Sequence, residues 1–293
     1  MCDRPSTRTR SNPEGVQVAE IPTSGLGQQL EVTQARSAAY AMLAHGFQYP
    51  DHSVIATLTD PQLWEGWPDV IGAIDGEAGV SLQSVRDLVK ELAGCSDSDP
   101  REWQQLYDDL FGHAVRGKCP AYEMEYGRNE IIRQASDLAD LAGFYRAFGL
   151  EIASDACGRP DHISAECEFM SALCAKEGHA HAQGDDTNVD ICLDGERAFL
   201  RDHLGRWLPA LAHSVQAADE DGLFGALARF ADAFVKAECS HFDIQAGPPT
   251  LELRPLDPVN DTQISCGPTG CGEGGANEPL VQLGLDRPDS KNR

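Results

Sequence analysis

Two segments of the chain combine proline, aromatic and charged residues in an order that a simple amphipathic helix does not require. The first runs Tyr107-Asp-Asp-Leu110-Phe111-Gly and, after five residues, Lys118-Cys-Pro120-Ala-Tyr122-Glu123-Met-Glu-Tyr126. The second runs Arg159-Pro160-Asp161-His162-Ile163-Ser-Ala-Glu166-Cys-Glu-Phe-Met170. Because these residue types go beyond what core packing needs, both segments are candidates for a binding site.

The Pro160-Asp161-His162 triplet stands at the start of a helical stripe that continues to Cys174. Pro160 fixes the backbone, and Asp161 is predicted to cap the helix, which is typically worth about 1 kcal/mol. His162 falls in the first turn, where we expect it to be partly exposed. Two roles stay open for each residue. Asp161 either only caps the helix or also binds a ligand, and His162 either only bonds a neighbouring loop or binds a ligand.

Clustered aspartates offer a different chemistry. Asp185, Asp186 and Asp190 lie close together, and this spacing resembles the Asp-rich motif with which isoprenoid synthases hold magnesium and diphosphate. That chemistry needs carboxylates that project from a helix into an apolar cavity, with a second cluster opposite. Here the cluster follows a polar stretch, so a solvated loop is favoured. A magnesium-dependent all-α isoprenoid-diphosphate enzyme is the alternative function.

Other catalytic and metal-binding signatures are missing from the sequence. It has no Gly-x4-Gly-Lys-Ser/Thr phosphate loop, no Gly-x-Ser-x-Gly and no His-Glu-x-x-His. Cys266 and Cys271 supply two thiolates, but no Cys-x-x-Cys and no nearby histidine completes a metal site. Cys167 and Cys174 share a helix face and are predicted to pack in the core. We therefore predict no catalytic residue, no bound metal, no cofactor and no enzymatic turnover.

The apolar residues recur with a helical period through most of the chain. Such stripes run over 40–47, 85–92, 103–111, 131–148, 163–174, 200–215 and 223–234. Gly149 and Gly178 are predicted to end helices, and Pro209 to kink or divide one. No alternation of apolar and polar residues is long enough to predict a strand. The predicted fold class is all-α.

The composition indicates which part of the chain folds and which classes of partner are excluded. All 20 aromatic residues lie between Tyr40 and Phe242, so a single domain is predicted at 31–242, with mobile or loosely wrapped segments at 1–30 and 243–293. The domain has 36 acidic and 16 basic residues, a balance that argues against binding nucleic acid or anionic lipid. No apolar stretch suits a membrane span or an export signal. The ten scattered cysteines favour reduced thiols in the cytoplasm.

The two mixed segments together resemble the TorD/DmsD/NarJ family of cytoplasmic redox-enzyme maturation chaperones. The resemblance rests on the aromatic-x-x-Leu-Phe element, the Pro/Tyr segment after it, a Gly-Phe-Tyr-x-Ala-Phe-Gly helix end at 143–149 and the Pro-Asp-His-Ile-x-x-Glu-x-Glu-Phe-Met string at 160–170. It covers about 100–210 and leaves both ends of the chain uncovered. Lys-Cys-Pro-x-Tyr-Glu-x-Glu-Tyr is most similar to the branch that serves type II molybdoenzymes of the dimethyl sulfoxide reductase family. Gly158 departs from the pattern, since many relatives have an acidic residue there.

The resemblance implies a helical-bundle chaperone that binds the apo catalytic subunit of a molybdopterin oxidoreductase and its twin-arginine signal peptide. Such a chaperone assists insertion of the molybdenum cofactor and prevents premature export. It acts in the cytoplasm as a monomer or a domain-swapped homodimer, without binding nucleic acid or inserting into a membrane. A peptide with arginines and an apolar helix fits an apolar groove rimmed by acid, and the negative charge would speed the encounter. The implied client-binding residues are Tyr107, Leu110, Phe111, Pro120, Tyr122, Glu123, Tyr126, Pro160, Asp161, His162 and Glu166.

Overall fold

The helical period of the sequence recurs in the computed structural model, which describes residues 23–78, 82–94, 99–112, 116–127, 131–152, 159–255 and 280–282. The helices are α1 (Thr23–Gly46), α2 (His52–Leu58), α3 (Pro61–Glu65), α4 (Trp67–Ala78), α5 (Leu82–Gly94), α6 (Pro100–Phe111), the 3-10 turn η1 (Glu123–Glu125), α7 (Ile131–Ala147), α8 (Ile163–Gln183), α9 (Asp186–Asp202), α10 (Leu204–Ala218) and α11 (Leu223–His241). Two short strands, β1 (Leu150–Ile152) and β2 (Leu280–Gln282), pair antiparallel. The predicted all-α class is confirmed, with one strand pair that the sequence did not predict.

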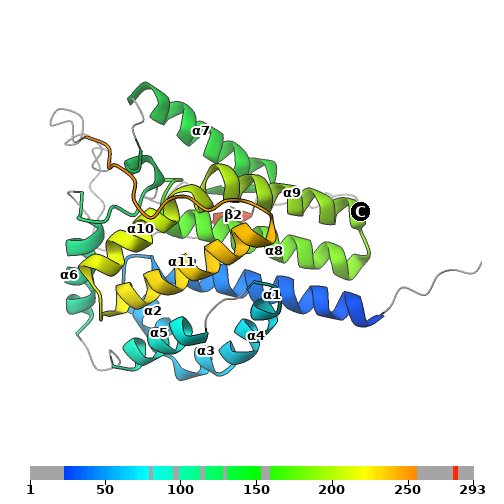
Figure 1. Ribbon diagram of the computed structural model, residues 1–293, viewed down its shortest axis with the longest axis horizontal. Coiled ribbons are helices and arrows are strands. Elements are labelled where there is room, and N and C mark those ends of the chain that lie inside the picture. The colour runs from blue at the N-terminus through cyan, green and yellow to red at the C-terminus, as the bar shows by residue number, and fades with distance from the viewer. Residues whose placement is uncertain are drawn as a thin grey trace, which may run out of the picture.

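The core lies where the long helices pack side by side (Figure 1). α1 runs along α8 and α10 runs along α11, while α9 packs against both α8 and α10. Aromatic side chains dominate the interior, and burying each one is worth roughly 1.5–3 kcal/mol. Fully buried examples are Tyr40, Phe169, Phe199, Trp207, Phe230 and Phe234. Cys167 and Cys174 are also fully buried, which confirms the prediction that they pack in the core.

Two predicted helix boundaries are wrong, and tertiary packing explains the first. α8 continues past Gly178 and ends at Gly184, which adopts the left-handed conformation with a φ of 66°. Gly178 instead lets α8 approach α1, since a Cβ atom there would lie 3.2 Å from Thr33 Oγ1. Pro209 lies inside α10 and does not divide it. The break falls at His203, which ends α9 and precedes α10.

The aspartate cluster is helical and not the predicted loop. Asp185 caps α9, its Oδ1 atom accepting the Asn188 N–H at 3.1 Å. Asp186 and Asp190 are exposed on the first turns of α9, so they do not face an apolar cavity. Among the described residues, no three His, Cys, Asp or Glu side chains are grouped so that they could hold a metal ion. This geometry does not suit magnesium–diphosphate chemistry.

A C-terminal strap, residues 243–255, leaves α11 and crosses α10 (Figure 1). The Gly247 N–H donates to the Gly205 carbonyl at 2.9 Å, and the Arg254 N–H donates to the Glu125 carbonyl at 2.9 Å. These bonds hold the strap on the surface, within the 243–293 segment that is predicted to be mobile or loosely wrapped. Apart from β2, the rest of that segment, including the Cys266 and Cys271 pair, lies outside the described residues. None of the described helices is long and apolar enough to cross a membrane.

A buried ion cluster joins four helices of the bundle. Arg36 of α1 lies 3.0 Å from Glu177 of α8, 2.5 Å from Glu196 of α9 and 2.7 Å from Glu238 of α11. All four side chains are buried. Burial raises the pKa of Glu196 to about 8, against the opposing effect of Arg36. One guanidinium thus serves three carboxylates, so the stability of the bundle depends strongly on this single cation.

Candidate functional site

The two mixed segments of the sequence meet in space. The loop from Ala121 to Glu123 lies against the start of α8. The Glu123 N–H donates to the Asp161 carbonyl at 2.8 Å, and the Ile163 N–H donates to the Ala121 carbonyl at 2.9 Å. Tyr122 and His162 form an isolated antiparallel bridge. The two sequence motifs therefore form one connected structure.

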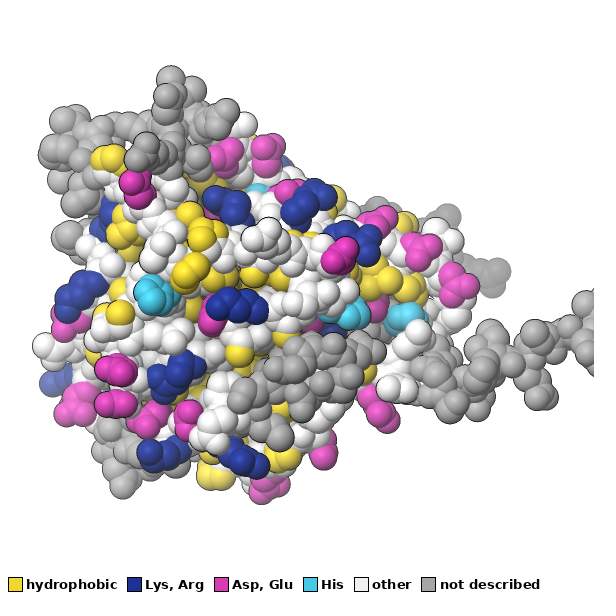
Figure 2. Space-filling model, in the orientation of Figure 1, with side chains coloured by type: hydrophobic (Ala, Val, Ile, Leu, Met, Phe, Trp, Pro, Cys, Tyr) yellow, Lys and Arg dark blue, Asp and Glu magenta, His cyan; other side chains and the backbone are white. Residues whose placement is uncertain are grey.

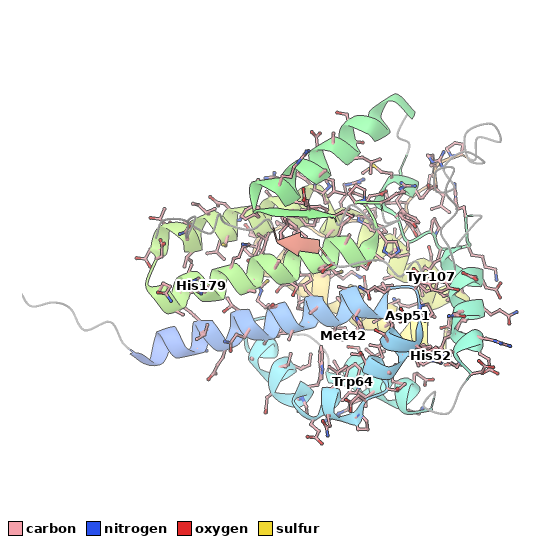
Figure 3. All side chains as sticks on the ribbon, turned by 180° about the vertical axis from the view of Figure 1, so that it is seen from behind. Met42, Asp51, His52, Trp64, Tyr107 and His179 are labelled. Carbon is pink, nitrogen blue, oxygen red and sulfur yellow. The ribbon has the colours of Figure 1, made fainter. Side chains whose placement is uncertain are left out.

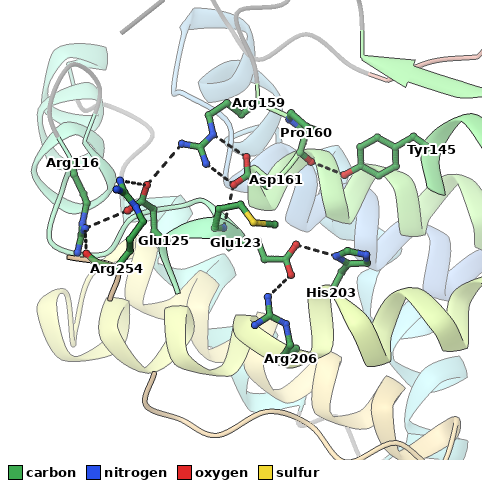
Figure 4. Close-up of polar contacts among 11 residues, drawn as sticks. Arg116, Glu123, Glu125, Tyr145, Arg159, Pro160, Asp161, His203, Arg206 and Arg254 are labelled. Atoms are coloured by element: carbon green, nitrogen blue, oxygen red, sulfur yellow. Dashed lines mark hydrogen bonds and ion pairs between the residues drawn. The ribbon is translucent and has the colours of Figure 1, made fainter. Parts of the chain in front are cut away.

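Asp161 is fully buried and is not the helix cap. Its carboxylate accepts two hydrogen bonds from the Arg159 guanidinium, at 2.9 and 2.7 Å, and a third from the Met124 N–H at 3.1 Å (Figure 4). Burial raises the pKa of Asp161, and the ion pair with Arg159 opposes that rise. Asp161 therefore fixes the backbone of η1 against the start of α8, one residue before the position that caps the helix.

His162 is the residue that caps α8, and the expectation of partial exposure is wrong, since only 3% of it is exposed. Its Nδ1 atom accepts the Ser164 N–H at 3.2 Å. Its Nε2 atom lies 3.3 Å from the Tyr107 hydroxyl, which donates to the Phe47 carbonyl at 3.1 Å. Burial lowers the pKa of His162 to about 3, so the ring is neutral at physiological pH.

Most of the other predicted site residues also face inward. Tyr107, Leu110, Phe111, Pro120, Glu123, Tyr126 and Glu166 are buried. Glu166 accepts the Trp207 Nε1–H at 3.0 Å, and Trp207 packs on the Tyr126 ring with centroids 5.2 Å apart. Tyr122 and Pro160 are half-buried. The Arg159 guanidinium carbon lies 4.6 Å from the centre of the Tyr122 ring. The Pro160 carbonyl accepts a hydrogen bond from the Tyr145 hydroxyl at 2.6 Å. The motif segments 107–111, 118–126 and 159–170 thus form one packed unit, which we call the frame.

Glu125 connects this frame to the C-terminal strap (Figure 4). Its carboxylate lies 3.2 Å from Arg116 and 3.2 Å from the buried Arg254. Arg159, 3.8 Å from Glu125, joins this cluster to Asp161. Three arginines around two buried carboxylates fix the loop at 116–127 from both sides. The loop can then present a rigid edge to whatever lies beside it.

Beside the frame lies a groove of about 750 Å³. α7 forms one wall, η1 contributes one residue, and the α9–α10 junction forms the opposite side. The lining residues are Met124, Asp137, Ala139, Asp140, Gly143, Phe144, Ala147, Asp202, His203 and Arg206. A cavity of this size with both apolar and polar lining is typical of a ligand-binding site.

The floor of the groove is built on the frame. The buried Glu123 carboxylate lies 3.0 Å from His203 Nδ1 and 2.5 Å from an Arg206 Nη atom (Figure 4). The His203 ring packs against Phe144 of α7, with centroids 5.3 Å apart. Glu123 therefore couples η1 to the α9–α10 junction, and His203 couples that junction to α7.

The groove carries excess negative charge. Its lining holds three aspartates and a single arginine, and the buried Glu123 already neutralises that arginine, Arg206. Asp202 pairs with Arg201 at 2.5 Å, outside the lining. Asp137 and Asp140 add two further carboxyl groups along the α7 wall. On the face shown in Figure 2, acidic and basic side chains are interspersed and do not form one acidic patch. A cation is thus attracted by this local arrangement.

The prediction of site residues missed most of the groove, although a signal was present. Asp137, Asp140, Phe144 and Ala147 are spaced by three or four residues, so they share one face of α7. That face is distinct from the one that carries Leu141 and Tyr145 into the core. Of the predicted residues, Glu123 lies directly beneath the groove, and the others surround or support it.

Replacing Gly195 by alanine should destabilise the chain, although alanine ordinarily favours a helix over glycine by about 1 kcal/mol. Gly195 lies in α9 beneath Phe148, and a Cβ atom would lie 2.4 Å from Phe148 Cζ. Phe148 packs on Phe169 and helps to seat α7. We expect a loss of about 1–3 kcal/mol, measured by chemical denaturation.

A matched control is Gly72→Ala in α4, where no atom lies within 4 Å of the added Cβ atom. This variant should be as stable as the wild type or slightly more stable. If Gly195→Ala unfolds at or above the wild-type denaturant concentration, α7 is not seated through this contact.

Comparisons with known proteins match the part of the chain that holds the groove. A family model described as nitrate reductase delta subunit matches residues 78–213, which include every lining residue. The perchlorate reductase assembly chaperone protein of Dechloromonas aromatica is 28% identical over 214 residues, 72% of this chain and 91% of that protein. The chlorate reductase assembly chaperone protein of Ideonella dechloratans is 32% identical over 187 residues, 64% of this chain and 79% of that protein. Chaperone protein TorD of Vibrio cholerae is 24% identical over 160 residues, 53% of this chain and 70% of that protein.

Proposed function

The chain belongs to the TorD/NarJ family of reductase assembly chaperones, and we propose that it holds the apo catalytic subunit of a molybdoenzyme through the groove beside α7. The matched relatives are assembly chaperones and not catalysts, so the prediction of no enzymatic turnover is confirmed. The alternative of a magnesium-dependent isoprenoid-diphosphate enzyme is therefore dropped.

The ligand that fits the groove best is a peptide with adjacent positive and apolar residues. Phe144, Ala139 and Ala147 offer apolar surface on α7. Asp137 and Asp140 add carboxyl groups along the same wall. A twin-arginine signal peptide has this composition, since its arginines precede an apolar helix. Helix-in-groove recognition combines such contacts, with charge at the rim and apolar side chains at the centre. We therefore propose that the groove binds the signal peptide of the client.

Holding the signal peptide and the apo subunit together would serve the order of assembly. A client whose leader lies in the groove cannot reach an export machinery, so the molybdenum cofactor can be inserted first. This proposal sets the site of action in the cytoplasm. The single observation that carries it is the combination of acid and apolar surface in one groove, supported by a rigid frame.

Neutralising the α7 wall should weaken peptide binding without unfolding the protein. Asp137→Asn with Asp140→Asn removes two negative charges from the groove, and each rim charge is worth about 0.2–1 kcal/mol. We expect the dissociation constant of a synthetic twin-arginine leader peptide, measured by calorimetry, to rise about tenfold at low salt and less at high salt. The melting temperature should stay within about 2 °C, because changes on the surface seldom alter stability much.

The matched control removes the same charge elsewhere. Asp186 and Asp190 are exposed on α9 and do not line the groove, so Asp186→Asn with Asp190→Asn should leave the affinity unchanged. Equal weakening by both double variants would mean that the overall field of the protein attracts the peptide. No weakening by either one would remove the α7 wall from the binding site.

A further inference from the structure

The strand pair at the back of the molecule takes no part in the groove. β1 follows α7 through Gly149, which has a φ of 72°. Its register with β2 pairs Leu150 with Gln282, Glu151 with Val281 and Ile152 with Leu280. In Figure 3, β2 lies beside β1 and next to α8. The end of the chain therefore returns to a site about 130 residues earlier in the sequence.

β1 offers the backbone edge and the side-chain pattern of a strand acceptor. Leu150 is buried, Glu151 is exposed and Ile152 is half-buried. Successive residues of a strand face opposite sides, so an added strand meets one apolar side at Leu150 and Ile152. The segment that pairs with it, Leu280-Val281-Gln282, carries no charge. The edge thus suits an extended, uncharged segment with an apolar residue opposite Ile152.

The pairing with β2 is short and joined by a long connection. It spans three residue pairs, and residues 256–279 separate the strap from β2. A longer segment from another chain could add further backbone pairs and replace β2. The strand pair therefore has the properties of an exchangeable contact.

We propose that β1 is a strand-addition edge for an extended segment of the client, and that Leu280–Gln282 occupies this edge in the free chaperone until the client segment replaces it. Binding by strand addition uses backbone hydrogen bonds for affinity and alternate side chains for selectivity. The edge is close to the groove along the chain, because Ala147 lines the groove and β1 begins at Leu150. The inference rests on the proposed function for the identity of the client.

The acceptor edge can be tested without any client. A chain that ends at Glu278 lacks β2, and hydrogen exchange of its amides at 150–152 should be at least tenfold faster than in the full chain. A synthetic peptide of residues 276–286 should restore slow exchange at millimolar concentration. The same peptide with proline at positions 280 and 282 should not, because proline cannot donate to the ladder. Unchanged exchange on truncation, or no effect of the first peptide, would overturn the proposal.

Binding of the client then tests whether a client segment replaces β2. We expect the apo catalytic subunit to bind the truncated chain at least threefold tighter than the full chain and to slow exchange at 150–152. Equal or weaker binding to the truncated chain would overturn the replacement of β2 by the client. If the apo subunit binds neither chain, the proposed function itself fails. The peptide titration still decides in that case whether β1 accepts a strand.

Discussion

Arg36→Met is expected to lower the free energy of unfolding by about 3–5 kcal/mol, the range typical of a broken buried ion pair. Arg36 lies within 3.0 Å of Glu177, Glu196 and Glu238, and all three carboxylates are buried with it. Methionine fills a similar volume but supplies no charge. The variant leaves three buried carboxyl groups without the cation that they share. Urea denaturation followed by circular dichroism at pH 7.5 measures the loss.

The pH dependence of the deficit identifies its cause. Arg36 opposes the rise that burial causes in the pKa of Glu196, so without Arg36 this carboxyl group is protonated more readily in the folded state. The deficit relative to wild type should therefore shrink as the pH falls from 8 towards 5. Arg101→Met, an exposed change of equal charge on α6, should stay within about 0.5 kcal/mol of wild type at every pH. A deficit that does not vary with pH would mean that lost packing, not charge, causes it.

The wild type should itself show one part of this titration. The pKa of Glu196 is about 8 in the folded protein, above its ordinary value of 4.5. A group whose pKa is higher in the folded than in the unfolded protein contributes its full stabilisation at pH values below the unfolded-state pKa. That contribution is lost as the pH rises towards the folded-state pKa. The contribution of Glu196 to the free energy of unfolding therefore decreases as the pH rises from about 4.5 to about 8. Glu196→Gln should remove this slope while it keeps an acceptor for Arg36.

The sequence predicted the helices because local periodicity governs them, but it did not predict where two of them end. Gly178 has the residue type of a helix stop, yet its contact with Thr33 on α1 makes it part of an interface. Pro209 has the type of a helix breaker, yet it lies buried inside α10. For Gly178, a contact distant in sequence decides between two local possibilities.

The ion cluster and the strand pair were beyond prediction for the same reason. Arg36 and Glu238 are 202 residues apart, and neither is distinguished from an exposed surface charge by its neighbours in the sequence. The strand segments have only three residues each, which is too short for an alternating pattern to stand out. Only the fold brings these partners together.

The motif residues show a different limit. Their order predicted the family but neither their proximity nor their burial, because polar residues in an ordered loop can face either way. Asp161 and His162 face inward, since the 121–123 segment covers them and the Arg159 side chain neutralises Asp161. The motif therefore supports the groove from beneath, while the residues of α7 that line it belong to a less distinctive helix.

Asp161→Asn is expected to lower the free energy of unfolding by about 2–3 kcal/mol, because it breaks a buried ion pair. The loss stays below the full range for such pairs, since 26% of the Arg159 side chain is exposed and water can solvate it. Asparagine can still accept the Met124 N–H, so the backbone contact survives while the charge is lost. Combining this change with Arg159→Met should give a coupling energy of at least about 1 kcal/mol in a double-mutant cycle.

The same variant separates the frame from the groove. Asp161 holds Met124, and Met124 lines the groove, so peptide affinity should fall about three- to tenfold together with stability. His162→Ala should cost roughly 1 kcal/mol through loss of the helix cap, with a smaller effect on affinity. The Asp137→Asn and Asp140→Asn pair should instead weaken binding with no loss of stability. If Asp161→Asn unfolds like the wild type and yet binds no peptide, Asp161 contacts the client directly, and the frame must open when the client binds.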